Sequence, residues 1–189
     1  MAYFAAVLAR TDDGWDVSET ELDDVETLAD LTDLAREAAQ DDDSVLVFIE
    51  QEDAWFAIVR VDGEEDPRIF VSDGAAAARS SYGSVLTDEL VEQAGESEFD
   101  DLDDLVAELD DEAEASERDD GGEDEDDEAP AVGPGGVPVG PLGDSEILVE
   151  FGLAAKDLVE LSGEGAVPGD ALAEIADALG CGEILEAVR

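Results

Sequence analysis

Val45–Ile49 (VLVFI) and Ala54–Val61 (AWFAIVRV) are two runs of β-branched and aromatic residues with only a few polar residues between them. Such runs are typical of β-strands, and Glu52-Asp53 suits a short hairpin loop between them. A turn at Asp62-Gly63 then leads into a third predicted strand over Pro67–Val71. Because short loops join consecutive strands antiparallel, this region predicts an antiparallel meander.

The residues before this meander predict a further strand pair and a helix. Tyr3–Arg10 is one strand, Thr11–Gly14 a tight turn and Trp15–Val17 a short partner strand, since Asp and Gly tolerate the turn's backbone angles. Ser18 and Glu21 have the spacing of a helix capping box. A helical stripe of apolar residues runs from there to about residue 39: Val25, Leu28, Leu31, Leu34, Ala35 and Ala38.

A second helix is predicted after the meander. Ala75–Val91 is rich in alanine, with an expected interruption near Gly83. The resulting order of elements predicts an α+β domain over residues 1–92, a small antiparallel sheet with helices on one face. The aromatic residues are then either the core of the sheet or, where helices leave a face uncovered, an interface.

The middle of the chain is acidic and of low complexity. Residues 93–130 hold 20 acidic residues and one basic residue, and residues 129–143 are rich in proline and glycine. Repulsion between like charges and the prolines together predict a disordered, extended linker over residues 93–143. Within it a short amphipathic helix is predicted near residues 99–110 from Phe99, Leu102, Leu105, Val106 and Leu109.

The last section, residues 144–189, predicts a small helical module. Ser145–Phe151 and Lys156–Leu161 are expected as short helices, and a longer helix begins at Pro168 and ends near Gly180. A final turn or two follows from Cys181. Because so few residues bury little surface alone, this module is expected to dock on the first domain or on a partner.

Charge and composition exclude several functions. The net charge is −48, with 56 acidic and 8 basic residues and no histidine. Such a surface repels phosphate groups and anionic lipids, so neither direct nucleic-acid binding nor membrane binding is expected. Without histidine there is no histidine base and no histidine-ligated metal. No signal-peptide pattern and no long apolar run are evident, and a single cysteine fits a reducing cytoplasm.

The remaining chemistry predicts no catalytic, cofactor or metal site. Acidic runs such as Asp100–Asp104 supply oxygen ligands but lack the spacing of a calcium loop, and Gly133–Gly136 lacks the Lys-Ser/Thr of a phosphate loop. Cys181 is expected as a free structural thiol, although a position near a helix N-terminus would lower its pKa. The candidate partner-binding residues are the amphipathic set Phe99, Leu102, Leu105, Val106 and Leu109, with Trp15 and Trp55.

Four stretches resemble a known family. Tyr3–Arg10 with Trp15, the region from Val45 to Gly63, Arg68–Asp73 and Pro168–Ala176 are similar to actinobacterial tRNA adenosine deaminase-associated proteins. The resemblance implies an accessory protein with a deaminase as partner. The chain is not itself the deaminase, because that enzyme needs an H-x-E and a P-C-x-x-C for its zinc site.

The sequence therefore predicts a non-catalytic, acidic accessory protein that binds a basic partner, with a tRNA adenosine deaminase implied by the resemblance. Two alternatives remain. The chain is a nucleic-acid mimic or chaperone-like polyanion for many basic proteins, or its acidity reflects a salt-adapted organism and its role is unrelated to tRNA editing.

Overall fold

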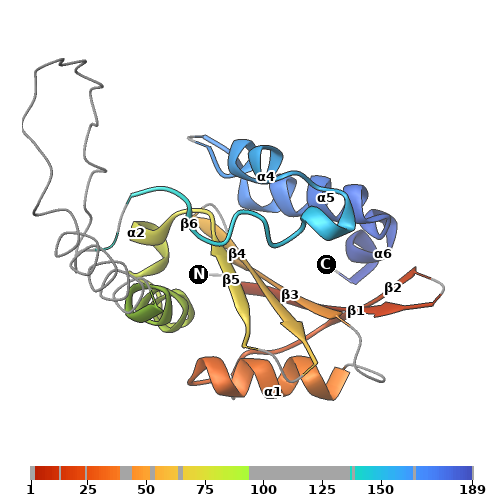
Figure 1. Cartoon of the computed structure of the whole chain (residues 1–189), viewed down its shortest axis with the longest axis horizontal. Helices are drawn as coiled ribbons and strands as arrows, with labels where there is room; N and C mark the ends of the chain where they lie inside the picture. Colours follow the sequence, from red (N-terminus) through yellow and green to blue (C-terminus); the bar gives the residue numbers. More distant parts are fainter. Residues whose placement is uncertain are drawn as a thin grey trace, which may run out of the picture.

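The structure, a computed structural model, describes residues 3–12, 14–23, 25–38, 44–51, 54–63, 66–93, 137, 139–163 and 165–188. Within these ranges six antiparallel strands form one sheet in the order β2-β1-β3-β4-β5-β6 (Figure 1). The strands are β1 (Tyr3–Thr11), β2 (Gly14–Glu19), β3 (Ser44–Gln51), β4 (Trp55–Asp62), β5 (Arg68–Val71) and β6 (Leu142–Gly143).

The predicted strands and meander are confirmed. β3, β4 and β5 follow one another as antiparallel neighbours, and β1 pairs with β2 on one side and β3 on the other. Successive side chains of a strand point to opposite faces of the sheet, and the central strands are apolar on both faces. Trp55, Ala57 and Val59 of β4 lie in one buried cluster, whereas Phe56 and Ile58 lie in the other. A sheet of this kind needs cover on both faces.

The helices of the first section cover one face, as expected. They are α1 (Leu28–Ala38), α2 (Gly74–Ala77) and the helical residues 81–93. Leu31 and Ala35 of α1, Ala77 of α2 and Leu86 and Leu90 beyond it all join the cluster on this face. The α+β fold class is therefore confirmed, with α1 below the sheet in Figure 1.

The C-terminal section covers the second face (Figure 1). It contains the 3₁₀ helix η2 (Val149–Phe151), α4 (Ala155–Leu161), α5 (Pro168–Leu179) and α6 (Gly182–Val188). Leu172 and Ile175 of α5 pack in the same cluster as Phe48 and Phe56 of the sheet, and α6 contacts β2. Of the two possibilities left open by the sequence, core or interface, the aromatic residues Phe48, Phe56 and Phe70 on this face are core, because the C-terminal helices bury them.

Four local expectations are corrected. Ser18 lies in β2, and the capping box of α1 is formed by Thr27 and Asp30 instead. The break after α2 falls at residues 78–80, because Ser80 Oγ accepts the Gly83 N–H and starts the next helix. Residues 145–148 are turns rather than helix.

The fourth correction concerns the predicted linker, whose last two residues, Leu142–Gly143, pair with β5 as β6. The rest of that segment, apart from residues 93, 137 and 139–141, lies outside the described residues, and so does the helix predicted near 99–110. In the described ranges no helix combines the length and the apolar character that a membrane crossing requires.

Candidate functional site

Arg60 is a buried cation at the junction between the sheet and the C-terminal section. It lies on β4, opposite Leu46 of β3 and Arg68 of β5, and only 6% of it is exposed. It faces the C-terminal section, because Phe56 and Ile58 at alternate positions before it pack against those helices. A charge in this position needs partners, since an unpaired buried charge is very costly.

The partners of Arg60 come from both sides of the junction. Its Nε lies 2.7 Å from the Asp62 carboxylate on the same strand, and its Nη2 donates to the Glu150 carboxylate of η2. Its Nη1 donates to the backbone oxygen of Ile147 at 3.2 Å. Burial lowers the pKa of the Arg60 guanidinium, but the hydrogen bond to Glu150 and the nearby Asp62 carboxylate outweigh burial and raise it above its ordinary value.

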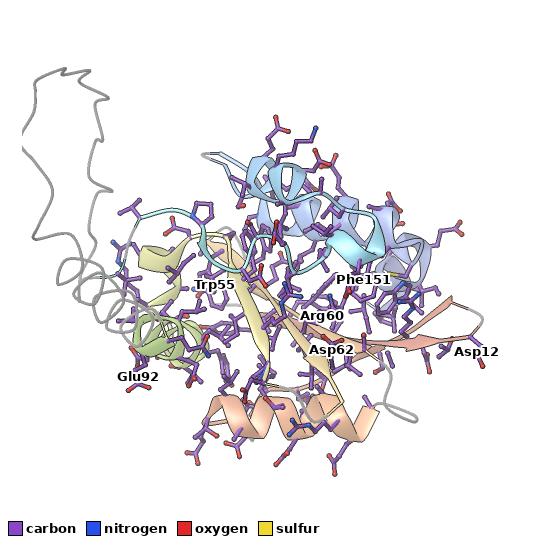
Figure 2. The ribbon with its side chains drawn as sticks, in the orientation of Figure 1. Asp12, Trp55, Arg60, Asp62, Glu92 and Phe151 are labelled. Atoms are coloured by element: carbon purple, nitrogen blue, oxygen red, sulfur yellow. The ribbon has the colours of Figure 1, made fainter. Side chains whose placement is uncertain are left out.

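Phe151 completes this cluster with an aromatic ring. The Arg60 guanidinium lies 4.8 Å from the ring centre and that of Arg10 lies 5.3 Å away, so two cations contact one ring. The Trp15 ring meets Phe151 edge-on at 5.1 Å. Figure 2 shows Arg60, Asp62 and Phe151 together between the sheet and the C-terminal helices. We call Arg10, Trp15, Arg60, Asp62, Glu150 and Phe151 the arginine cluster.

The charged groups around Arg60 in the arginine cluster pair with one another across the junction. The Arg60 guanidinium is paired with the carboxylates of Asp62 and Glu150, both within the protein. A second pair lies alongside, where Arg68 Nε donates to Asp144 Oδ2 at 2.5 Å. This pair sits in a cleft of about 540 Å³ that also contains Asp66 and Glu89. Both pairs connect β4 and β5 to the segment that follows β6.

A second cavity, of about 530 Å³, lies where the ends of β4 and β5 meet the C-terminal section. Its charged lining, among the residues the structure describes, is limited to Asp73. Its apolar lining consists of Ala54, Phe56, Val139, Pro141, Val159, Leu161, Ala166 and Pro168. We call this cavity the valine groove, because Val139 and Val159 are exposed at it.

The predicted partner-binding residues fall in different places. Trp15 is half-buried in the arginine cluster. Trp55 is fully buried on the other face of the sheet, where its Nε1 donates to Gln51 Oε1 at 2.8 Å. The remaining five residues lie outside the described ranges: Phe99, Leu102, Leu105, Val106 and Leu109. The two described members of the predicted set, Trp15 and Trp55, therefore lie on opposite faces of the sheet.

Two features of the structure, the buried Arg60 and the valine groove, were not predicted from the sequence. Arg60 had a detectable signal, because it is a cation at an inward position of a strand that is otherwise apolar. The valine groove had none, since its lining residues come from segments far apart in the chain.

Cys181 is buried at the start of α6, in the cluster between the sheet and the C-terminal helices. Burial, with a smaller contribution from the Asp177 carboxylate, raises the pKa of its thiol from 9.0 to about 11. The suggestion of a lowered pKa is thus wrong, because removal of the thiolate from water outweighs the helix terminus. Across the ranges described, no three acidic or cysteine side chains come together as a metal site.

A protein-family model matches the chain over most of its length. The model of the Rv3753c-like tRNA adenosine deaminase-associated protein family matches residues 3–182. The chain belongs to this family. Neither the curated proteins nor the solved structures yielded a match. The family match confirms the resemblance seen in the strands and in α5, and it spans the acidic middle segment as well.

Proposed function

We propose that this chain is a non-catalytic accessory protein that binds a tRNA adenosine deaminase through the enzyme's basic surface. The observation that carries the proposal is the family match, whose description is an association with that enzyme. An associated protein acts on its partner by binding, so the proposal names an interaction rather than a reaction.

The charge of the chain supports this choice of partner. A tRNA-binding enzyme must present cationic groups to the phosphate backbone. A chain with a net charge of −48 is attracted to such a surface and accelerated towards it at low ionic strength. It therefore competes with tRNA and with non-specific RNA for the same basic face, and such competition would tune the activity of the enzyme.

The chemistry of the chain supports a non-catalytic role. It has no histidine, and its single cysteine is buried with a pKa raised to about 11. A thiol in that environment is a poor nucleophile. The buried cation Arg60 is committed to Asp62, Glu150 and Phe151, which leaves it no role towards a substrate.

A binding experiment with the purified full-length chain tests the proposal. The chain is immobilised, and the tRNA adenosine deaminase encoded in the same genome is passed over it at about 0.05 M and about 0.5 M NaCl. We expect binding at both salt concentrations, weaker at the higher one. Polyglutamate serves as the control, because it presents negative charge without a fold.

Two results would contradict the proposal. Absence of binding at low salt excludes the deaminase as partner. Binding that is equal for the chain and for polyglutamate, and that the higher salt removes from both, identifies a generic polyanion. A variant with the acidic residues of 99–128 changed to their amides adds a further check, since we expect it to bind less tightly at low salt.

A further inference from the structure

We propose that the valine groove is the docking site for an apolar side chain on the basic face of the deaminase. This inference rests on the proposed function and adds to it the surface of contact. It concerns a part of the molecule that the acidic segment 93–130 does not include.

The chemistry of the groove points to an apolar occupant. Its polar side chains are already engaged within the protein: Ser72 Oγ accepts the Phe56 N–H at 2.9 Å, and Ser162 Oγ donates to a backbone oxygen at 2.7 Å. The Asp73 carboxylate accepts the Ala76 N–H at 2.9 Å as the cap of α2. With these side chains engaged, the larger part of the surface that the groove offers a ligand is apolar.

Exposed apolar side chains gather at this groove. Val139 and Val159 line it and are 52% and 41% exposed, and Val167, 49% exposed, lies between the lining residues Ala166 and Pro168. Across the described ranges the other strongly exposed large apolar side chains are Tyr3, Val91, Val149 and Ile184. Such a concentration at a concave surface is typical of an interaction site.

The walls of the groove are held in place before any partner binds. Two of its lining residues are buried. Phe56 lies in the core beneath the C-terminal helices, and Pro168 lies at the start of α5. The wall that carries Val139 is fixed by a hydrogen bond from the Gly74 N–H to the Gly140 oxygen at 2.8 Å. A preformed site costs its ligand less ordering than one that assembles on contact.

Charge decides between the occupants of an apolar groove. A second copy of this chain brings another net charge of −48 to the contact, and the chain's own segment 93–130 brings 20 acidic residues with one basic residue. Both are repelled by the molecule that bears the groove. On α4 the single cation Lys156 is outnumbered by Asp157 and Glu160. A basic partner with an apolar anchor is the occupant that charge favours.

Single substitutions at the exposed valines test the site. Val159→Glu and Val139→Glu each place a carboxylate in the groove, and Val91→Glu is the matched control. Val91 is a helical valine exposed to 43%, close to the 41% of Val159, and it lies among the helices on the opposite face of the sheet. All three variants gain the same negative charge. Since all three side chains are exposed, circular dichroism and urea unfolding should match the wild type.

The readout is the Kd of each variant for the purified deaminase, measured by calorimetry at about 0.15 M and about 0.5 M NaCl. We expect Val159→Glu and Val139→Glu to raise Kd at least about tenfold at both salt concentrations, and Val91→Glu to change it less than about twofold. An added carboxylate on its own should tighten binding to a basic partner, so weakening identifies loss of apolar contact.

The other outcomes separate the two proposals. If the wild type binds and all three variants bind equally well, the groove is not the docking site while the proposed function stands. If the wild type does not bind the deaminase, the proposed function fails and this inference fails with it. Light scattering of the chain alone is run in parallel. A wild-type dimer that dissociates in Val159→Glu would assign the groove to a second copy and overturn the inference.

Discussion

The guanidinium group of Arg60 on β4 lies over the ring of Phe151 in η2, 4.8 Å from its centre. The same guanidinium donates to Glu150 and to the backbone oxygen of Ile147. One side chain of the sheet therefore contacts three residues of the C-terminal section, Ile147, Glu150 and Phe151. Because the Arg60 side chain is buried, its contacts with Phe151 and with the Ile147 oxygen are stronger than the same contacts on the surface, whereas the Glu150 carboxylate is largely exposed to water. The arginine cluster thus joins the two sections of the chain.

Replacement of Arg60 should destabilise the protein. Arg60→Ala leaves the Asp62 carboxylate without its cation and removes the cation from Phe151. We expect the free energy of unfolding to fall by about 2 to 3 kcal/mol, less than the roughly 3 to 5 kcal/mol for breaking a fully buried pair, since Glu150 is largely exposed. Urea unfolding followed by circular dichroism measures this change.

The control for this substitution is Arg79→Ala, which removes the same charge from an exposed position. Its free energy of unfolding should stay within about 0.5 kcal/mol of the wild type. An Arg60→Ala variant as stable as Arg79→Ala would show that the arginine cluster does not join the two sections.

The capping box of α1 provides a second prediction. Thr27 Oγ1 accepts the Asp30 N–H, and the Asp30 carboxylate accepts the Thr27 N–H at 2.9 Å. Thr27→Ala should lower the free energy of unfolding by about 1 kcal/mol. Ser18→Ala, at the cap expected from the sequence, should leave it within about 0.5 kcal/mol, because Ser18 is exposed on β2. Equal losses for both variants would refute this assignment of the cap.

The same contacts make part of the stability depend on pH. The Thr27 hydroxyl and the backbone N–H groups of Glu26 and Thr27 lower the pKa of Asp30 below 3.8. The folded state then binds the proton less tightly than the unfolded state. The contribution of Asp30 is therefore complete above about pH 4 and is lost as the pH falls through its folded pKa. In acid unfolding, the Asp30→Asn variant should lack the loss of stability that protonation of Asp30 causes in the wild type.

The strands were predictable because their signal is local. In β4, apolar residues occupy both faces over consecutive positions, which identifies a strand covered on both sides. The position of the C-terminal helices was not predictable in the same way. Leu172 and Ile175 show that α5 has an apolar face, but not which surface covers that face. Which surface covers this face of α5 is determined by tertiary packing, and tertiary packing leaves no periodic pattern in the sequence.

The candidate site was predictable only in part. Trp15 was singled out and does lie against Phe151, whereas Trp55 proved to be core. β6 was missed because two residues in a segment rich in proline and glycine have no detectable alternation, and their strand character depends on the free edge of β5. Val139 and Val159 line one groove although they lie on opposite sides of β6 in the chain.

A pair of glycines tests how β6 is fitted against β5. Gly140 and Gly143 both have positive φ, +102° and +95°, but a Cβ at Gly140 would meet open space. A Cβ at Gly143 would lie 2.2 Å from the Ile69 oxygen. We expect Gly140→Ala to cost about 1 kcal/mol from backbone strain and Gly143→Ala about 2 kcal/mol more from overlap. Thermal unfolding of both variants measures the difference, and equal melting temperatures would show that β6 does not approach β5 so closely.

The buried thiol of Cys181 predicts a loss of stability at high pH. Burial raises its pKa from 9.0 to about 11 in the folded state, so between these values the folded protein keeps a proton that the unfolded chain has released. The contribution of Cys181 is therefore complete below about pH 9 and is lost as the pH rises towards 11. Urea midpoints of the wild type should fall over this window more steeply than those of Cys181→Ala, in which the other titrating groups are unchanged.

Reactivity of the same thiol gives an independent check. Ellman's reagent at pH 8 should label the native chain slowly and the guanidinium-unfolded chain at the rate of a free cysteine peptide, because the reagent needs an accessible thiolate. Arg60→Ala should increase the native rate, since Cys181 lies in the cluster between the sheet and the C-terminal section that Arg60 helps to hold closed. Rapid labelling of the native wild type would place Cys181 at the surface and contradict the packing of α5 and α6 on the sheet.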